Sequence, residues 1–206
     1  MIRRKLKEII PLVKLYQKLF LPKKPAKSED QWVRIIMDQR TDELIKGLSY
    51  GSLMTLEISG SKWKNFGFQS YENKFFPELD ICKSGLDKRF DLIIAEQVFE
   101  HLAYPYRAGK NIFDMLNSGG YFLITTPFLL KIHPDPIDCN RWTPLGLQYF
   151  LNECGFEMED VFVDSWGNRE CLMANIDEWK EFKSGSHSLK NDSILPLVVW
   201  ALARKK

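Results

Sequence analysis

The sequence lacks the features that would assign it to a zinc-binding, disulfide-stabilised or membrane-spanning class. Its four cysteines (Cys82, Cys139, Cys154 and Cys171) lie far apart, and none of them forms a C-x-x-C pair. No apolar run approaches the roughly 18–20 residues that a membrane-spanning helix needs. Scattered thiols without disulfide spacing are typical of cytoplasmic proteins, so we expect that location.

The net charge of the whole chain is small, but basic residues are concentrated at its start. The formal net charge is +2 over 206 residues, whereas residues 1–27 hold nine Lys or Arg and one acid, Glu8. That segment carries +8, so the rest of the chain carries −6. Because nucleic-acid-binding domains usually spread basic residues over the folded body, we expect no nucleic-acid partner.

The basic segment 1–27 is expected to form an amphipathic helix over 2–21 and a linker, followed by one domain over 28–206. Lys14 and Lys18 interrupt its apolar stretch, which argues against a signal peptide. Two roles stay open for this helix. It can cover the domain as a cap, or it can contact a protein or an anionic inner membrane surface from the cytoplasmic side.

Hydrophobic patterns beyond the linker predict alternating strands and helices, with an irregular, aromatic segment over 62–78. Strands are expected at 53–58, 78–81, 91–95, 121–126, 161–163 and 196–203, and helices at 29–48, 98–102, 105–116, 144–154 and 170–182. Such alternation predicts an α/β fold with parallel strands, in which ligands bind at the carboxyl ends of the strands.

Glu57-Ile-Ser-Gly-Ser61 follows the first expected strand. Small residues there allow backbone N–H groups to approach a ligand closely. Asp80 comes 23 residues after Glu57, a distance at which an acid can bind ribose hydroxyls. Taken alone, this pattern is equally typical of an ordinary strand-to-helix turn.

Three further segments are similar to one enzyme family. Residues 89–102 (RFDLIIAEQVFEHL) and 116–124 (LNSGGYFLI) resemble two signatures of small-molecule class I S-adenosylmethionine-dependent methyltransferases. Residues 138–147 (DCNRWTPLGL) resemble a stretch found in methyltransferases of bacterial surface-glycan gene clusters. With the turn at 57–61, these motifs follow the family order, and the resemblance spans about 53–203.

The resemblance implies a Rossmann-like sheet, mostly parallel with an antiparallel last strand and preceded by N-terminal helices. Only ten residues separate Asp80 from Asp91, so we expect the sheet to be shortened around its third strand. The implied enzyme uses S-adenosylmethionine and methylates oxygen or nitrogen of a small or glycan-linked acceptor.

The resemblance also implies the cofactor-binding residues. The methionine end is assigned to Glu57, Ser59, Gly60 and Ser61; the nucleoside to Asp80 and Ile81; the surroundings of the sulfonium to Glu96 and Gln97. Ser59 and Ser61 stand where the family has glycine. Gly85 and Leu86 are weaker candidates for the rest of the adenine wall.

The loop after the strand expected at 121–126 supplies the candidate catalytic residues. His133 is the best base by type, Asp138 can orient it or bind the acceptor, and Arg141 can bind an acceptor carboxylate or phosphate. The alternative is an internal Asp138–Arg141 ion pair. We expect His101 to bond the backbone, and no metal site from His133, Asp135 and Asp138.

Two other functions are weighed against methyl transfer. The serine-substituted turn and the shortened sheet are compatible with a catalytically silent partner subunit that binds the cofactor. A nicotinamide-dependent oxidoreductase would share the sheet. The missing third glycine of G-x-G-x-x-G and the glutamate that opens the turn argue against the oxidoreductase.

Overall fold

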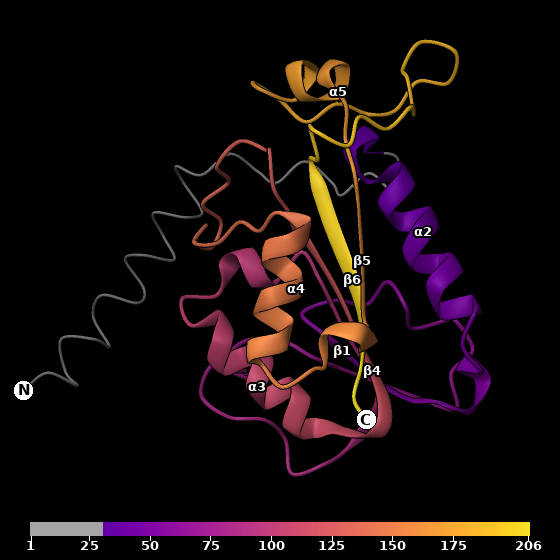
Figure 1. Cartoon of the computed structure of the whole chain (residues 1–206), viewed down its shortest axis with the longest axis vertical. Helices are drawn as coiled ribbons and strands as arrows, with labels where there is room; N and C mark the ends of the chain where they lie inside the picture. The colour runs from indigo at the N-terminus through magenta and orange to yellow at the C-terminus, as the bar shows by residue number, and fades with distance from the viewer. Residues whose placement is uncertain (1–30) are drawn as a thin grey trace, which may run out of the picture.

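The computed structural model describes residues 31–206, in which helices enclose one six-stranded sheet (Figure 1). The expected helix over 2–21 lies outside the described residues. The strands are β1 (Met54–Ile58), β2 (Ser70–Lys74), β3 (Phe90–Glu96), β4 (Leu116–Pro127), β5 (Val161–Trp166) and β6 (Val198–Arg204). The helices are η1 (Trp32–Arg34), α2 (Ile35–Lys46), η2 (Tyr50–Ser52), η3 (Phe99–His101), α3 (Pro105–Met115), α4 (Pro144–Glu153), η4 (Met158–Asp160) and α5 (Arg169–Ala174).

The sheet has the order β2-β1-β3-β4-β6-β5 and confirms the expected fold class. Strands β2, β1, β3 and β4 pair in parallel, whereas β6 runs antiparallel to both β4 and β5. Figure 1 shows α2 on one side of the sheet and α3 and α4 on the other. The carboxyl ends of the parallel strands therefore meet at one edge, where a ligand of this fold is expected.

The second strand lies where the sequence predicts irregular structure. Residues 70–74 form β2 and pair with β1, whereas 78–81 lie in turns and form no strand. The prediction failed because β2 is a polar edge strand, Ser-Tyr-Glu-Asn-Lys, without apolar alternation. The segment after it runs along α3: Ile81 O accepts from Asn111 Nδ2 at 2.7 Å, and Leu86 N contacts Met115 Sδ at 3.0 Å. Among the described residues, β2 is an edge strand and no further strand pairs with it.

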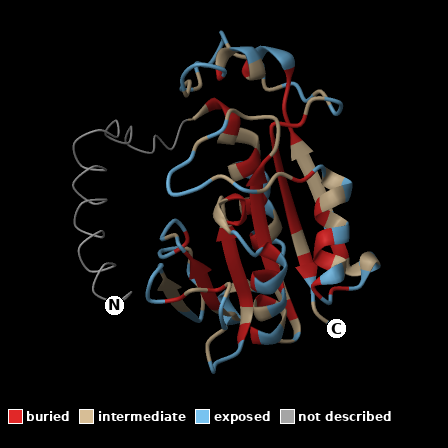
Figure 2. Cartoon of the chain, turned by 90° about the vertical axis from the view of Figure 1, so that its left-hand side faces the viewer, coloured by how far each residue is buried: buried red, intermediate tan, exposed pale blue. Residues whose placement is uncertain are grey.

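The central strands are buried on both faces, as Figure 2 shows. The largest core cluster joins β1, β3, β4 and β6 to α3 and α4. Two helices begin at residues that favour helix starts: Pro144 begins α4 beside the capping hydroxyl of Thr143, and Asn168 caps α5. The helix expected over 170–182 ends at Ala174. Among the described residues, no helix has the length and apolar character needed to cross a bilayer.

Candidate functional site

Backbone strain marks the carboxyl edge of the sheet. Within residues 31–206, the only non-glycine residues with positive φ are Ser59 (57°) and Gln97 (54°). Ser59 directly follows β1 and Gln97 directly follows β3, and these two strands are neighbours. Left-handed backbone at non-glycine residues costs of order 1–3 kcal/mol and clusters at functional sites. Ser59 thus keeps the conformation for which a glycine would be expected, and the strain places a candidate site at this edge.

The buried carboxylate of Glu57 holds the turn after β1 in shape. Its side chain is 1% exposed and accepts hydrogen bonds from Lys62 N (3.1 Å), Trp63 N (3.1 Å) and Tyr71 Oη (2.6 Å). Burial raises the pKa of this carboxyl, and the three hydrogen bonds oppose that shift. A Cβ at Gly60 would collide with Glu57 Oε1, so this position must be glycine for the carboxylate to remain in place.

The exposed side of the same turn is formed by small residues. Ser59 and Ser61 are exposed and Gly60 is half-buried, so no large side chain covers the backbone there. Ser59 N donates to Lys74 O at 2.8 Å and thereby continues the β1–β2 ladder. The edge therefore offers hydroxyl and backbone N–H donors, which suit a carboxylate such as that of methionine.

Glu96 is partnered by two residues that the sequence reasoning missed. Its Oε2 accepts from Trp63 Nε1 (2.9 Å) and its Oε1 from Lys62 Nζ (3.1 Å). Lys62 Nζ also pairs with Asp38 of α2 at 3.0 Å. Lys62 and Trp63 directly follow the small-residue turn, and that adjacency was the available signal. Together they connect α2, the turn after β1 and the end of β3.

Gln97 points toward the end of β4. Its backbone N–H donates to Thr125 O (3.0 Å), and its side-chain Nε2 donates to Thr125 Oγ1 (3.1 Å) and contacts Met37 Sδ of α2 (3.7 Å). These bonds hold the left-handed residue in position. Glu96 and Gln97 therefore lie at the same edge as residues 59–61, as the predicted site requires.

Asp80 lies in a turn and not at the end of β2. Its Oδ1 accepts from Cys82 N (3.2 Å), and its Oδ2 pairs with Lys83 Nζ (2.9 Å). Ile81 is buried in the main core, with 4% exposure. The residues that directly follow β2 are Phe75 and Phe76, whose side chains are 45% and 72% exposed. The sequence reasoning left these two aromatic residues unassigned because it placed the strand later.

Gly85 and Leu86 are poor candidates for the adenine wall. A Cβ at Gly85 would press on Met115, the last residue of α3, and Leu86 N contacts the same side chain. Met115 precedes Leu116, which pairs with Phe90 at the amino end of β3. Both residues therefore lie toward the opposite edge of the sheet from Ser59 and Gln97.

The loop between β4 and α4 brings its three predicted residues together. Arg141 forms a two-pronged ion pair with Asp138, and His133 N donates to Asp138 Oδ2 at 2.9 Å. Burial would raise the pKa of Asp138, but the Arg141 guanidinium and the His133 N–H outweigh it, so this pKa lies below its ordinary value. The internal ion pair weighed from the sequence is therefore present. This ion pair engages the Arg141 guanidinium, which was expected to bind an acceptor.

His133 is placed between two carboxylates. Its Nε2 lies 3.8 Å from Glu100 Oε1 and its Nδ1 lies 3.4 Å from Asp138 Oδ2. The Glu100 carboxylate raises the pKa of His133, burial opposes the shift, and the Lys131 carbonyl and Asp138 add to it. His101 bonds the backbone as expected, with Nδ1 on the Ile137 carbonyl. Glu100 is a further residue that the sequence reasoning did not single out.

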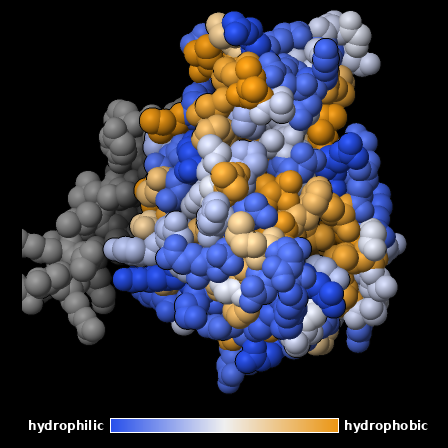
Figure 3. Space-filling model, viewed as in Figure 1, coloured by the Kyte–Doolittle hydropathy of each residue, from blue (hydrophilic) through white to orange (hydrophobic). Residues whose placement is uncertain are grey.

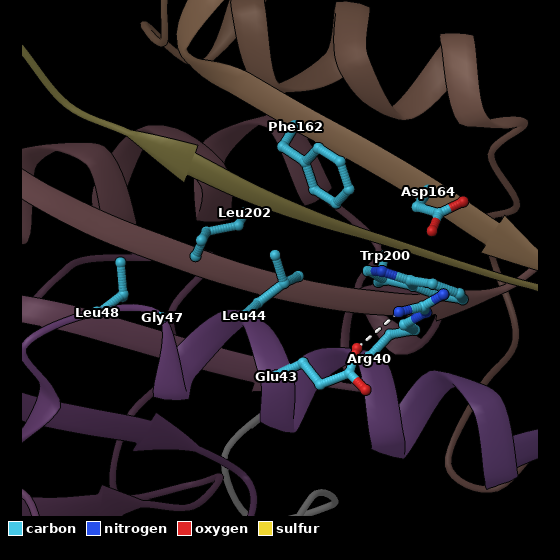
Figure 4. A pocket seen from close by; sticks show the side chains of 9 residues that line it. All are labelled: Arg40, Glu43, Leu44, Gly47, Leu48, Phe162, Asp164, Trp200 and Leu202. Atoms are coloured by element: carbon cyan, nitrogen blue, oxygen red, sulfur yellow. Dashed lines mark hydrogen bonds and ion pairs between the residues drawn. The ribbon is translucent and has the colours of Figure 1, made fainter.

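A separate cavity lies beside α2 (Figure 4). It has a volume of about 570 Å³ and is lined by residues of α2, β5 and β6. Apolar side chains such as Leu44, Phe162 and Leu202 line it, with the Arg40–Glu43 ion pair beside them. Figure 3 shows hydrophobic residues along this side of the molecule. No residue from the turns after β1 or β3 contributes to the cavity, so it is separate from the strained edge.

Comparison with known proteins identifies relatives of the domain. A family described as methyltransferase domain matches residues 19–158. The fold is similar to that of an S-adenosylmethionine-dependent methyltransferase from Archaeoglobus fulgidus, with 16% identity, a TM-score of 0.56, and coverage of 94% of this chain and 99% of that one. No curated protein sequence matches the chain.

Two further structures have this fold. The N-methyltransferase NodS from Bradyrhizobium japonicum, in complex with S-adenosylhomocysteine, is 13% identical with a TM-score of 0.53, over 93% of this chain and 97% of that one. An O-methyltransferase from a Brevibacillus brevis multienzyme, with the same ligand, is 11% identical with a TM-score of 0.51, over 89% and 83%.

Proposed function

Because the chain belongs to the methyltransferase-domain family and is a class I S-adenosylmethionine-dependent methyltransferase, we propose that its acceptor is an oxygen or nitrogen of a small or glycan-linked molecule. The single observation that supports the site is the pair of left-handed residues, Ser59 and Gln97, at adjacent strand ends. Bound S-adenosylmethionine supplies an activated methyl group on its sulfonium. The residues of the chain must bind it, align the acceptor and receive the acceptor proton.

The turn at 59–61 is proposed to hold the methionine end. Its exposed backbone and the hydroxyls of Ser59 and Ser61 fit a carboxylate. Glu57 acts from beneath, because all three of its hydrogen bonds keep the turn in shape. Glu96 and Gln97 form the neighbouring strand end, close to where the sulfonium would lie.

The nucleoside is proposed to lie over the residues that follow β2. Asp80 can accept hydrogen bonds from ribose or adenine, since a quarter of its side chain is exposed. Phe75 offers an exposed aromatic face, and Ile81 supports the floor from the core. These assignments replace the expectation that Asp80 ends the second strand.

The acceptor is proposed to enter beside the β4–α4 loop. His133 is the candidate base on this loop, while the Asp138–Arg141 ion pair holds the loop. Ile132 and Ile137 of the same loop are exposed, at 77% and 42%, and Figure 3 shows hydrophobic residues at this end. Apolar surface beside charged groups suits an acceptor with an apolar portion, such as a lipid-linked sugar.

Methyl transfer from labelled S-adenosylmethionine tests this proposal. We expect label in a nucleotide- or lipid-linked sugar bearing a free hydroxyl or amine. His133→Ala should lower turnover by about 10²–10⁴-fold with little change in cofactor affinity, whereas His187→Ala, at a histidine that stacks on Trp32 outside this loop, serves as the control. Near-native turnover in His133→Ala would give His133 a structural role. Cofactor binding without labelling of any acceptor would favour the silent partner subunit.

A further inference from the structure

Three side chains converge where η3 meets the β4–α4 loop. Glu100, His101 and His133 each offer one oxygen or nitrogen atom, and these atoms lie within 4.8 Å of one another. Glu100 Oε1 is 3.5 Å from His101 Nε2 and 3.8 Å from His133 Nε2. The cluster joins residues 33 positions apart, so the fold and not the local sequence assembles it.

Glu100 is the least expected member of this cluster. Its side chain is 0% exposed, and neither carboxylate oxygen has a hydrogen-bond partner among the described residues. Its backbone is well held, because Glu100 O accepts from Cys139 N at 2.7 Å and from Asn140 N at 3.3 Å. A buried carboxylate without a partner is costly, and such groups in proteins are normally paired or coordinate metals. The backbone of Glu100 is therefore held in place, and its carboxylate would be stabilised by a cation, either a metal ion or a protonated imidazole.

The two imidazoles turn the same kind of atom toward Glu100. His101 Nδ1 bonds the Ile137 carbonyl, an acceptor, so that nitrogen carries the hydrogen. His133 Nδ1 faces two acceptors, Lys131 O and Asp138 Oδ2, each at 3.4 Å. In the neutral imidazoles, both Nε2 atoms are then lone-pair donors pointing at the carboxylate.

We propose that Glu100, His101 and His133 bind a divalent transition-metal ion. Two imidazole nitrogens and one carboxylate oxygen form a donor set known for Zn²⁺ and for Fe²⁺. Ligands at about 2.1 Å in tetrahedral geometry lie roughly 3.4 Å apart, close to the 3.5 and 3.8 Å separations found here. The Ile137 carbonyl and the Asp138 carboxylate provide the outer contacts that metal-binding histidines usually make through their second nitrogen.

A metal ion at this site would help to bind the acceptor, and this part of the inference rests on the proposed function. Three protein ligands leave at least one coordination position open, and His133 belongs to the loop beside which the acceptor is proposed to enter. A bound ion would hold the acceptor oxygen or nitrogen there and lower the pKa of its proton. His133 would then be a metal ligand and not the base, and the acceptor proton would pass to solvent water.

Direct ion binding tests the site without reference to methyl transfer. The full chain carrying Cys139→Ser, which removes an exposed thiol next to the cluster, is stripped with a chelator and titrated with Zn²⁺ in a calorimeter. Co²⁺ is the second probe, because its visible absorption reports coordination. We expect one ion per chain. Glu100→Gln, His101→Gln and His133→Gln should each weaken binding at least about tenfold to a hundredfold, the loss typical of even outer-shell changes.

His187→Gln is the matched control, since His187 stacks on Trp32 and belongs to no such cluster among residues 31–206. Circular dichroism and S-adenosylhomocysteine binding show whether each variant is folded. Absence of stoichiometric Zn²⁺ or Co²⁺ binding by the folded chain would overturn the site. The site would also be overturned if all three cluster variants bound the ion as tightly as the parent chain. Neither result bears on cofactor binding or on methyl transfer by the metal-free chain, which test the proposed function separately.

Discussion

At the scale of single residues, the turn after β1 shows that a glycine can be required by a buried side chain that packs against it. Gly60 lies against the buried carboxylate of Glu57, while its neighbours Ser59 and Ser61 tolerate side chains because they face outward. The sequence identified this turn correctly from its small residues. It did not reveal that Glu57 is fully occupied by the turn itself, because hydrogen-bond partners such as Tyr71 are distant in sequence.

Gly60→Ala should destabilise the protein and disrupt the turn. The added methyl group displaces Glu57 Oε1, which leaves buried N–H groups without their acceptor. The expected loss is about 2–4 kcal/mol in the free energy of unfolding. Urea denaturation measures it. Gly51→Ala is the control, because its Cβ would meet only ordinary contacts and should change stability by less than about 0.5 kcal/mol. Equal stability of the two variants would contradict this packing.

Asp80→Ala should weaken S-adenosylhomocysteine binding by roughly ten- to a hundredfold, or about 1.5–3 kcal/mol. The physical reason is the loss of a charged acceptor for nucleoside hydrogen bonds. Calorimetric titration measures the change. Asp87→Ala, which removes an exposed acid from the same connection, is the matched control. An unchanged dissociation constant in folded Asp80→Ala would remove Asp80 from the site.

At the scale of elements, the apolar strands were predictable and the polar edge strand was not. β3 and β4 contain the apolar runs 92–95 and 121–124, where strands were expected, although β4 begins earlier, at Leu116. β2 contains Glu72, Asn73 and Lys74, and its strand conformation depends on pairing with β1. The error moved the predicted strand end to Asp80 and hid Phe75. Glu100 was missed for a related reason, since only tertiary structure brings His133 to it.

The packing of α4 and α5 predicts which thiols react. Burial raises the pKa of Cys154, beside α4, and of Cys171, within α5, to about 12 in each case. Cys139 is exposed on the β4–α4 loop. Because the thiolate is the reactive species, iodoacetamide near neutral pH should modify Cys139 and spare the two buried thiols until urea is added. Mass spectrometry locates the label. Modification of Cys171 in the native chain would show that α5 opens readily.

At the scale of the whole molecule, the basic segment is still assigned only by its sequence. Residues 1–27 carry a charge of +8, and each basic residue near an anionic membrane contributes about 1 kcal/mol. If this segment contacts membranes, the full chain should co-sediment with anionic liposomes at low salt, and a chain beginning at Ser28 should not. If it is a cap, neither chain sediments, and the shortened chain loses cofactor binding or fails to fold.

The central claim is that the cofactor binds at the strained edge formed by the ends of β1 and β3. The rival location is the mostly apolar cavity beneath α2. A crystal structure of the complex with S-adenosylhomocysteine distinguishes the two. We predict density for the methionine end against residues 59–61, beside Gln97, with the nucleoside extending toward Phe75 and Asp80. Density for the ligand beneath α2, beside Phe162 and Leu202, would contradict this account.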